Sequence, residues 1–87
     1  MEKGGQDRLQ ALEGASRVVG TRQVLRGIQS GSLRAVYVAN DADTFLYQRI
    51  VRAAEAAGIP VIRVQSMKEL GQACGVSVST AAAGLTK

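Results

Sequence analysis

Short apolar runs alternate with amphipathic stretches along this chain, and the alternation predicts strands and helices in turn. Four runs have the length of strands, at residues 17–19, 35–39, 61–64 and 81–85. Apolar positions recur at helical spacing in the intervals, at residues 6–14, 20–30, 44–57 and 67–74. The order predicts an α/β fold, a three-layer α/β/α sandwich around a small mixed four-stranded sheet.

Residues with local capping chemistry mark several of these boundaries. Gly31 stands where a left-handed glycine ends a helix, and Asp43 stands where a side chain caps the next helix. Ser66 and Glu69 have the spacing of a capping box. Asp41, in the turn between the second strand and the third helix, is expected to anchor the turn beneath the helix that starts after Gly20.

The third helix is predicted to bury one stripe and expose another. The buried stripe is Leu46, Ile50, Ala53, Ala54 and Ala57. The exposed stripe is Gln48, Arg49, Arg52 and Glu55.

The segment from Gly20 to Gly31 has the strongest candidate binding chemistry. Its helical spacing places Val24, Leu25 and Ile28 on one side. The opposite side holds Arg22, Arg26 and Ser30, with Gln23 at its flank. A glycine turn, free first-turn amides and two arginines one turn apart favour a ligand that carries phosphate groups.

Charge distribution strengthens this interpretation. The net charge is +4, and no acidic residue lies between Glu13 and Asp41. That interval holds Arg17, Arg22, Arg26 and Arg34. A solvated basic surface is the alternative explanation, but the excess of arginine over lysine favours bidentate recognition of phosphates or bases. With aromatic residues at 3%, stacking of bases on an aromatic platform is not expected.

Composition limits the architecture and the compartment. The 87 residues form one predicted domain, residues 1–87, in which residues 1–5 are a flexible tail. We expect no signal peptide and no membrane span, since neither apolar pattern occurs. A cytoplasmic monomer is the resulting expectation.

The sequence contains no combination of residues that is typical of a catalytic site, and we expect neither a metal nor a cofactor. The chain contains no histidine, the commonest general base and metal ligand. Its one cysteine, Cys74, lacks a partner and is predicted to pack in the core. Asp41 and Asp43 are explained as turn and cap residues. The residues after Gly20 match neither a dinucleotide fingerprint nor a phosphate-binding P-loop.

Three segments together resemble the kink-turn RNA-binding ribosomal protein family, the L-seven-Ae family, and especially its small bacterial YbxF-like branch. Residues 20–26, Gly-Thr-Arg-Gln-Val-Leu-Arg, are similar to its G-T-N-E-x-x-K helix start. Residues 66–78 are similar to its S-x-K-x-L-G-x-A-C-G-[VIL]-x-V signature, and residues 38–43 to its V-A-x-D-x-D turn. The likeness runs from Ser16 to Leu85.

The resemblance implies a non-enzymatic protein that recognises a kink-turn in structured RNA, in ribosomal RNA or a riboswitch, with the ribosome as an associated partner. It assigns RNA binding to two sets of residues. These are Gly20, Thr21, Arg22, Gln23 and Arg26 at the helix start, and Val76, Ser77 and Val78 in the loop. The helix start enters the major groove in relatives, and the loop touches the kinked strand.

The chain departs from the family pattern at four positions. Gln23 replaces a glutamate, Ser77 a glutamate, Ser30 an arginine and Thr44 a proline. Two other functions stay open at this stage. One is a protein–protein adaptor that keeps the fold without RNA binding, and the other is a small phosphate-binding enzyme that uses the Gly20 turn.

Overall fold

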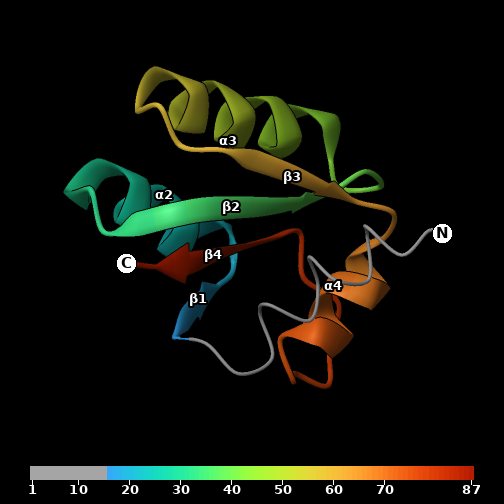
Figure 1. The fold of residues 1–87 in the computed structure, drawn as a ribbon. Helices are drawn as coiled ribbons and strands as arrows, with labels where there is room; N and C mark the ends of the chain where they lie inside the picture. The colour runs from blue at the N-terminus through green and yellow to red at the C-terminus, as the bar shows by residue number, and fades with distance from the viewer. Residues whose placement is uncertain (1–15) are drawn as a thin grey trace, which may run out of the picture.

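The computed structural model describes residues 16–87 and arranges them as one four-stranded sheet with helices on both faces (Figure 1). The expected helix at 6–14 and the expected tail at 1–5 lie outside the described residues. The three-layer α/β/α prediction is confirmed for the part of the chain that is described.

The sheet is mixed and has the strand order β1-β4-β2-β3. Strand β2 pairs in parallel with β3, whereas β4 pairs antiparallel with both β1 and β2. The bounds are β1 (Arg17–Val19), β2 (Leu33–Ala39), β3 (Val61–Val64) and β4 (Ala82–Thr86). The last strand therefore lies in the middle of the sheet, between the first two.

Strand β2 starts two residues before the predicted 35–39 run. A register irregularity between Leu33 and Ala35 interrupts its pairing with β4. Leu33 is buried with the helices of one face, Ala35 with the helix of the other, and Arg34 between them is exposed. Because Arg34 interrupts the apolar run, the sequence pattern does not include Leu33 and Arg34 in the strand.

Helices α2 (Thr21–Ser30) and α3 (Thr44–Ala56) cover one face of the sheet, and α4 (Met67–Ala73) covers the other. Between α2, α3 and the sheet lie Val24, Ile28, Leu33, Val36, Ile50, Ala54 and Ala82. Between α4 and the sheet lie Ala35, Tyr37, Ala39, Val64, Leu70, Ala73, Cys74, Ala83 and Leu85, together with Ala42. Within residues 16–87, no helix has the length and apolar character needed to cross a bilayer.

The predicted caps at Gly31, Asp43 and Ser66 are present in the structure, whereas Asp41 has a different role. Gly31 is left-handed (φ 71°), the Asp43 carboxylate accepts from the amides of Phe45 and Leu46, and the Ser66 hydroxyl accepts from the Glu69 amide at 3.1 Å. The expectation that Asp41 anchors the turn beneath α2 is wrong. Its carboxylate accepts from the Met67 amide at 2.7 Å, so it holds the start of α4.

The buried stripe of α3 ends before Ala57, which is exposed and not buried as predicted. Gly58 adopts a left-handed conformation (φ 72°), and the Ile59 amide then donates to the Ala54 carbonyl at 2.9 Å. This turn folds Ile59 back against the core. Ile59, which lies beyond the helix, therefore packs against the core where Ala57 does not.

Gly71 in α4 allows the segment 76–80 to lie directly on the helix. A Cβ atom built on Gly71 would stand 2.2 Å from the Val78 carbonyl oxygen, which is backbone and cannot swing aside. We therefore expect Gly71→Ala to lower the free energy of unfolding by about 1–3 kcal/mol. Urea denaturation measures the change.

The sign of this change is informative, because glycine to alanine inside a helix otherwise stabilises by up to about 1 kcal/mol. Gln72→Ala, at the neighbouring exposed position of α4, is the matched control and should be close to neutral. A Gly71→Ala protein as stable as its parent would contradict the close approach.

Candidate nucleic-acid interface

The turn that leads into α2 depends on Gly20. Its backbone has φ 105° and ψ 151°, a combination that glycine adopts readily and other residues hardly at all. The Gly20 amide donates to the Ala82 carbonyl at 2.9 Å, and its own carbonyl accepts the first helical hydrogen bond, from the Val24 amide. The helix therefore starts directly at the end of β1, beside the start of β4.

The start of α2 differs from the starts of the other described helices because no side chain caps it. Its first turn contains no acidic residue, and the first-turn amides have no acceptor within the helix. These amides carry the positive end of the helix dipole. Backbone and side-chain groups thus offer donors for an anion at the same place.

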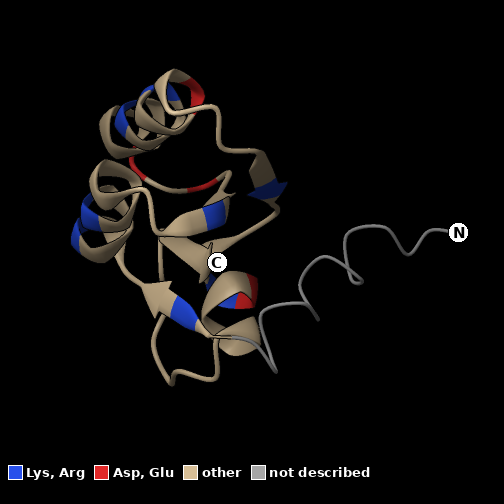
Figure 2. Cartoon of the chain, turned by 60° about the vertical axis from the view of Figure 1, so that its left-hand side comes forward, with Lys and Arg blue, Asp and Glu red and all other residues tan. Residues whose placement is uncertain are grey.

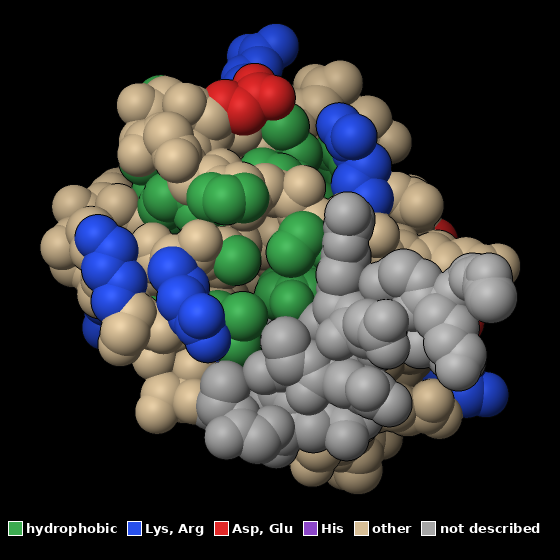
Figure 3. Space-filling model, viewed as in Figure 1, with side chains coloured by type: hydrophobic (Ala, Val, Ile, Leu, Met, Phe, Trp, Pro, Cys, Tyr) green, Lys and Arg blue, Asp and Glu red, His purple; other side chains and the backbone are tan. Residues whose placement is uncertain are grey.

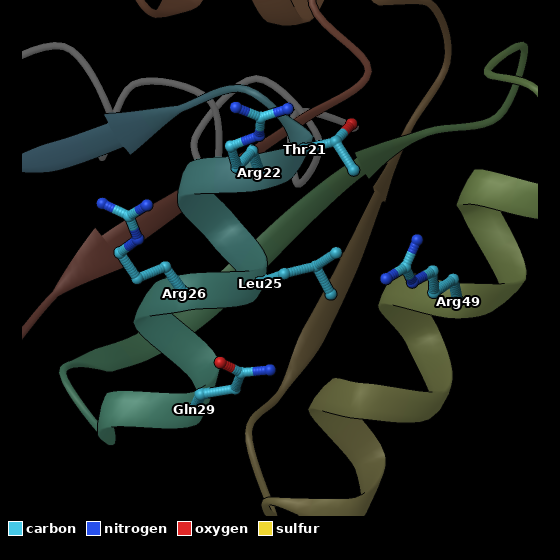
Figure 4. A pocket seen from close by; sticks show the side chains of 6 residues that line it. All are labelled: Thr21, Arg22, Leu25, Arg26, Gln29 and Arg49. Carbon is cyan, nitrogen blue, oxygen red and sulfur yellow. The ribbon is translucent and has the colours of Figure 1, made fainter.

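The arginines predicted on the outer side of α2 are exposed. Arg22, Gln23 and Arg26 all face solvent, while Val24 and Ile28 are buried beneath them. Within residues 16–87, the guanidinium groups of Arg22 and Arg26 have no hydrogen-bond or ion-pair partner. Figure 4 shows the two side chains projecting next to each other from the same side of the helix.

Leu25 packs against the same core cluster as Val24 and Ile28, as predicted, but from its edge. It is half-buried and points from α2 toward α3 (Figure 4). It lies at the edge of the apolar face, where the two helices meet.

The second predicted segment is a loop held at several points along its length. The Val76 amide donates to the Gly71 carbonyl at 3.1 Å, and the Thr80 amide donates to the Met67 carbonyl at 3.2 Å. At its base, Arg17 of β1 donates through Nε and Nη2 to the Cys74 carbonyl, at 3.2 and 2.6 Å. The loop is therefore fixed to both α4 and β1.

The loop residues assigned to RNA differ in exposure. Val78 is 69% exposed, and Ser77 is exposed beside it. Val76 is half-buried and packs against the core under α4. Val78 thus presents the free apolar surface of the loop, whereas Val76 also supports it from below.

The two predicted segments meet at one carbonyl group. The Ala82 carbonyl oxygen accepts both from the Gly20 amide, at the start of α2, and from the Thr80 hydroxyl, at the end of the loop, at 2.9 and 3.1 Å. The pairing of Val19 with Ala83 places the last residue of β1 beside the start of β4, at the same end of the sheet. The Ala82 carbonyl therefore joins the turn before α2 to the end of the loop that carries Val78.

Positive charge extends from α2 onto α3. Figure 2 shows basic residues along the outer sides of both helices. In Figure 3, hydrophobic side chains occupy the middle of the visible face, and Lys and Arg side chains stand at its margins. The side chains around the hollow between the helices are Thr21, Arg22, Leu25, Arg26, Gln29 and Arg49.

Sequence reasoning did not assign Arg49, Gln29 or Arg17 to the site. Arg49 was predicted only to be solvated, because nothing in the sequence pairs α3 with α2. Arg49 can be assigned to the site once α2 and α3 are known to cover the same face of the sheet, because it lies on the side of α3 that borders the hollow.

Cys74 is buried in the core, as predicted. Burial raises the pKa of its thiol, and the charge and hydrogen bond of Arg17 oppose that shift. A neutral, buried thiol is a poor nucleophile at neutral pH. Among the described residues, no group of three or more His, Cys, Asp or Glu side chains is placed to hold a metal ion.

Comparison with known proteins gives consistent matches. The model of the ribosomal protein L7Ae/L30e/S12e/Gadd45 family matches residues 5–87. An RNA-binding protein of Geobacillus sp. (strain WCH70) is 40% identical over 76 residues, which cover 87% of this chain and 93% of that protein. The RNA-binding protein YbxF of Geobacillus stearothermophilus is 38% identical over the same shares of both chains.

A solved structure has the same fold. The 15.5kD RNA binding protein of Giardia lamblia superposes with a TM-score of 0.92 at 27% identity, over 100% of this chain and 77% of that one.

The hydrogen bonds from Arg17 to the Cys74 carbonyl predict that Arg17→Met makes the loop more mobile. Loss of a charged donor to the Cys74 carbonyl should lower the free energy of unfolding by about 1.5 kcal/mol. The amides of Val76 and Thr80 should then exchange faster with deuterium, because their hydrogen bonds hold the loop. Arg34→Met, at an exposed position of β2, is the matched control. Unchanged exchange at both loop amides would contradict the tie.

Proposed function

Because this chain belongs to the ribosomal protein L7Ae/L30e/S12e/Gadd45 family, we propose that it is a non-enzymatic protein that binds kink-turns in structured RNA. Several relatives that match most of its length are named RNA-binding proteins. Ribosomal RNA and riboswitches in the cytoplasm are the targets that the family resemblance favours, with the ribosome as a partner.

The observation that carries this proposal is the Ala82 carbonyl, which joins the uncapped start of α2 to the end of the loop with Val78. A sharply kinked duplex crowds phosphate groups together, and it exposes bases that ordinary helices keep stacked. Free amides, the helix dipole and two unpaired arginines match the first feature. An exposed apolar side chain matches the second.

Each residue has a role that follows from its placement. Arg22 and Arg26 reach guanine edges or phosphates from the outer side of α2. Gln23 accepts or donates hydrogen bonds through its amide, where a carboxylate could only accept. Val78 covers an unstacked base, and Ser77 provides a hydroxyl next to it. Gly20 leaves open space at the turn, so that the RNA backbone can approach closely.

Nothing about the site favours catalysis. The chain has no histidine, and its one cysteine is buried with a raised pKa. The groups at the site are donors, amides and apolar surface, which bind and orient a ligand without transferring protons.

The decisive experiment compares a kink-turn RNA with the same duplex after its bulge is removed. We expect clearly tighter binding to the kink-turn, because only the bent form brings phosphates to α2 and an unstacked base to Val78 together. Fluorescence anisotropy with both RNAs at the same salt concentration measures the difference. Equal affinity would refute kink-turn recognition, and failure to bind either RNA would favour the adaptor function.

The two arginines of α2 provide the second test. We expect Arg22→Ala and Arg26→Ala each to weaken kink-turn binding roughly tenfold, through loss of a contact worth about 1–2 kcal/mol. For the parent, log K should fall with log salt concentration with a slope of about −2 to −3.

Arg34→Ala is the matched control, since it removes the same charge from an exposed position on β2. Arg34 follows Leu33, which pairs with Thr86 near the C-terminus. All three variants should keep the parent's thermal midpoint, because none of these side chains is buried. If the α2 variants bind like Arg34→Ala, the assigned surface is wrong.

A further inference from the structure

The hollow between α2 and α3 is lined by basic side chains from both helices. It measures about 510 Å³ and is open to solvent. Arg22 and Arg26 border it from α2, and Arg49 borders it from α3, 23 positions after Arg26 in the sequence. Leu25 points into the gap between the helices, and Arg49 lies across the gap from it (Figure 4).

The three guanidinium groups have nothing to neutralise them within residues 16–87. Among the described residues, none of the three guanidinium groups has a hydrogen-bond or ion-pair partner, and no acidic side chain lines the hollow. The acidic residues nearest to Arg49 in the sequence lie elsewhere: Asp43 caps the start of α3, and Glu55 does not line the hollow. Three like charges around one space repel each other, so their grouping does not stabilise the fold.

The shape of this basic surface fits an extended anion better than a small one. Helix α2 has 10 residues and is about 15 Å long, and the basic and polar residues that face the hollow follow it from Thr21 to Gln29. Arginines border the hollow on both sides, although those of α2 have their guanidinium groups turned away from α3 (Figure 4), and Thr21, Gln29 and Leu25 add polar groups and apolar surface. A phosphodiester strand presents charges at regular intervals and could follow this line, whereas a single phosphate group would engage only part of it.

We propose that the hollow binds the backbone of an RNA stem that continues past the kink, with Arg49 of α3 as a phosphate contact outside the helix start and the loop. This inference rests on the proposed function, because the stem reaches the hollow only when the kink is seated at the start of α2. Recognition here is by charge and is independent of sequence. The hollow therefore adds affinity and fixes the direction in which the stem leaves the protein.

The test uses Arg49→Ala and its matched control Arg52→Ala. Both residues are exposed arginines of the same helix, but only Arg49 lines the hollow. Affinity is measured for kink-turn RNAs in which each of the two stems, in turn, is either long or cut back close to the kink. With long stems, we expect Arg49→Ala to weaken binding about threefold to tenfold and to reduce the salt slope by about 1.

Arg52→Ala should leave both quantities at the parent's values. When the stem that occupies the hollow is cut back, the parent should lose affinity and Arg49→Ala should then bind as the parent does. Equal effects of Arg49→Ala and Arg52→Ala, or an Arg49→Ala effect that persists with both stems short, would overturn the proposal.

These outcomes are separate from the fate of the proposed function. If the parent does not distinguish the kink-turn from the bulge-free duplex, kink-turn recognition fails. If it does distinguish them and Arg49 makes no stem-dependent difference, the contact at the hollow fails alone. Circular dichroism of both variants verifies that α3 is intact, as expected for arginine to alanine on an exposed helix face.

Discussion

The antiparallel pairing of β1 with β4 is the constraint on which the candidate site depends. β1 leads into α2, β4 leads out of the loop, and their antiparallel pairing places both connections at the same end of the sheet. The Ala82 carbonyl completes the junction by accepting from the Gly20 amide and from the Thr80 hydroxyl. Two segments that are about 55 residues apart in sequence therefore hold a fixed relation, which no local feature of either segment could supply.

Local chemistry made most of the fold predictable. Gly31, Asp43 and Ser66 each end or begin a helix through contacts with residues a few positions away, so their effect can be read from the sequence. The prediction for Asp41 failed because a distant contact decides it: its carboxylate accepts from the Met67 amide, 26 residues later. The prediction for Ala57 failed for a local reason, because left-handed Gly58 turns Ile59 back onto the core.

The same division applies to the candidate site. Helical spacing alone places Arg22 and Arg26 on the outer side of α2, and the structure has them there. Arg17 and Arg49 could not be assigned in this way. Arg17 reaches the Cys74 carbonyl across 57 positions, and Arg49 comes near the arginines of α2 only because two helices share one face of the sheet. Periodicity gives the direction of a side chain but not its tertiary neighbours.

The start of α2 combines features that are unfavourable for an isolated helix. It lacks a side-chain cap, which is typically worth about 1 kcal/mol, and it has an arginine in the first turn, where the dipole favours acidic residues. The buried side chains of Val24 and Ile28, on the other side of the helix, provide the stabilisation that its own start lacks. The cap and the acidic residue that would improve the helix would also occupy or neutralise the donors at its start. An uncapped cationic helix start, held in place by its buried face, leaves those donors available for an anion.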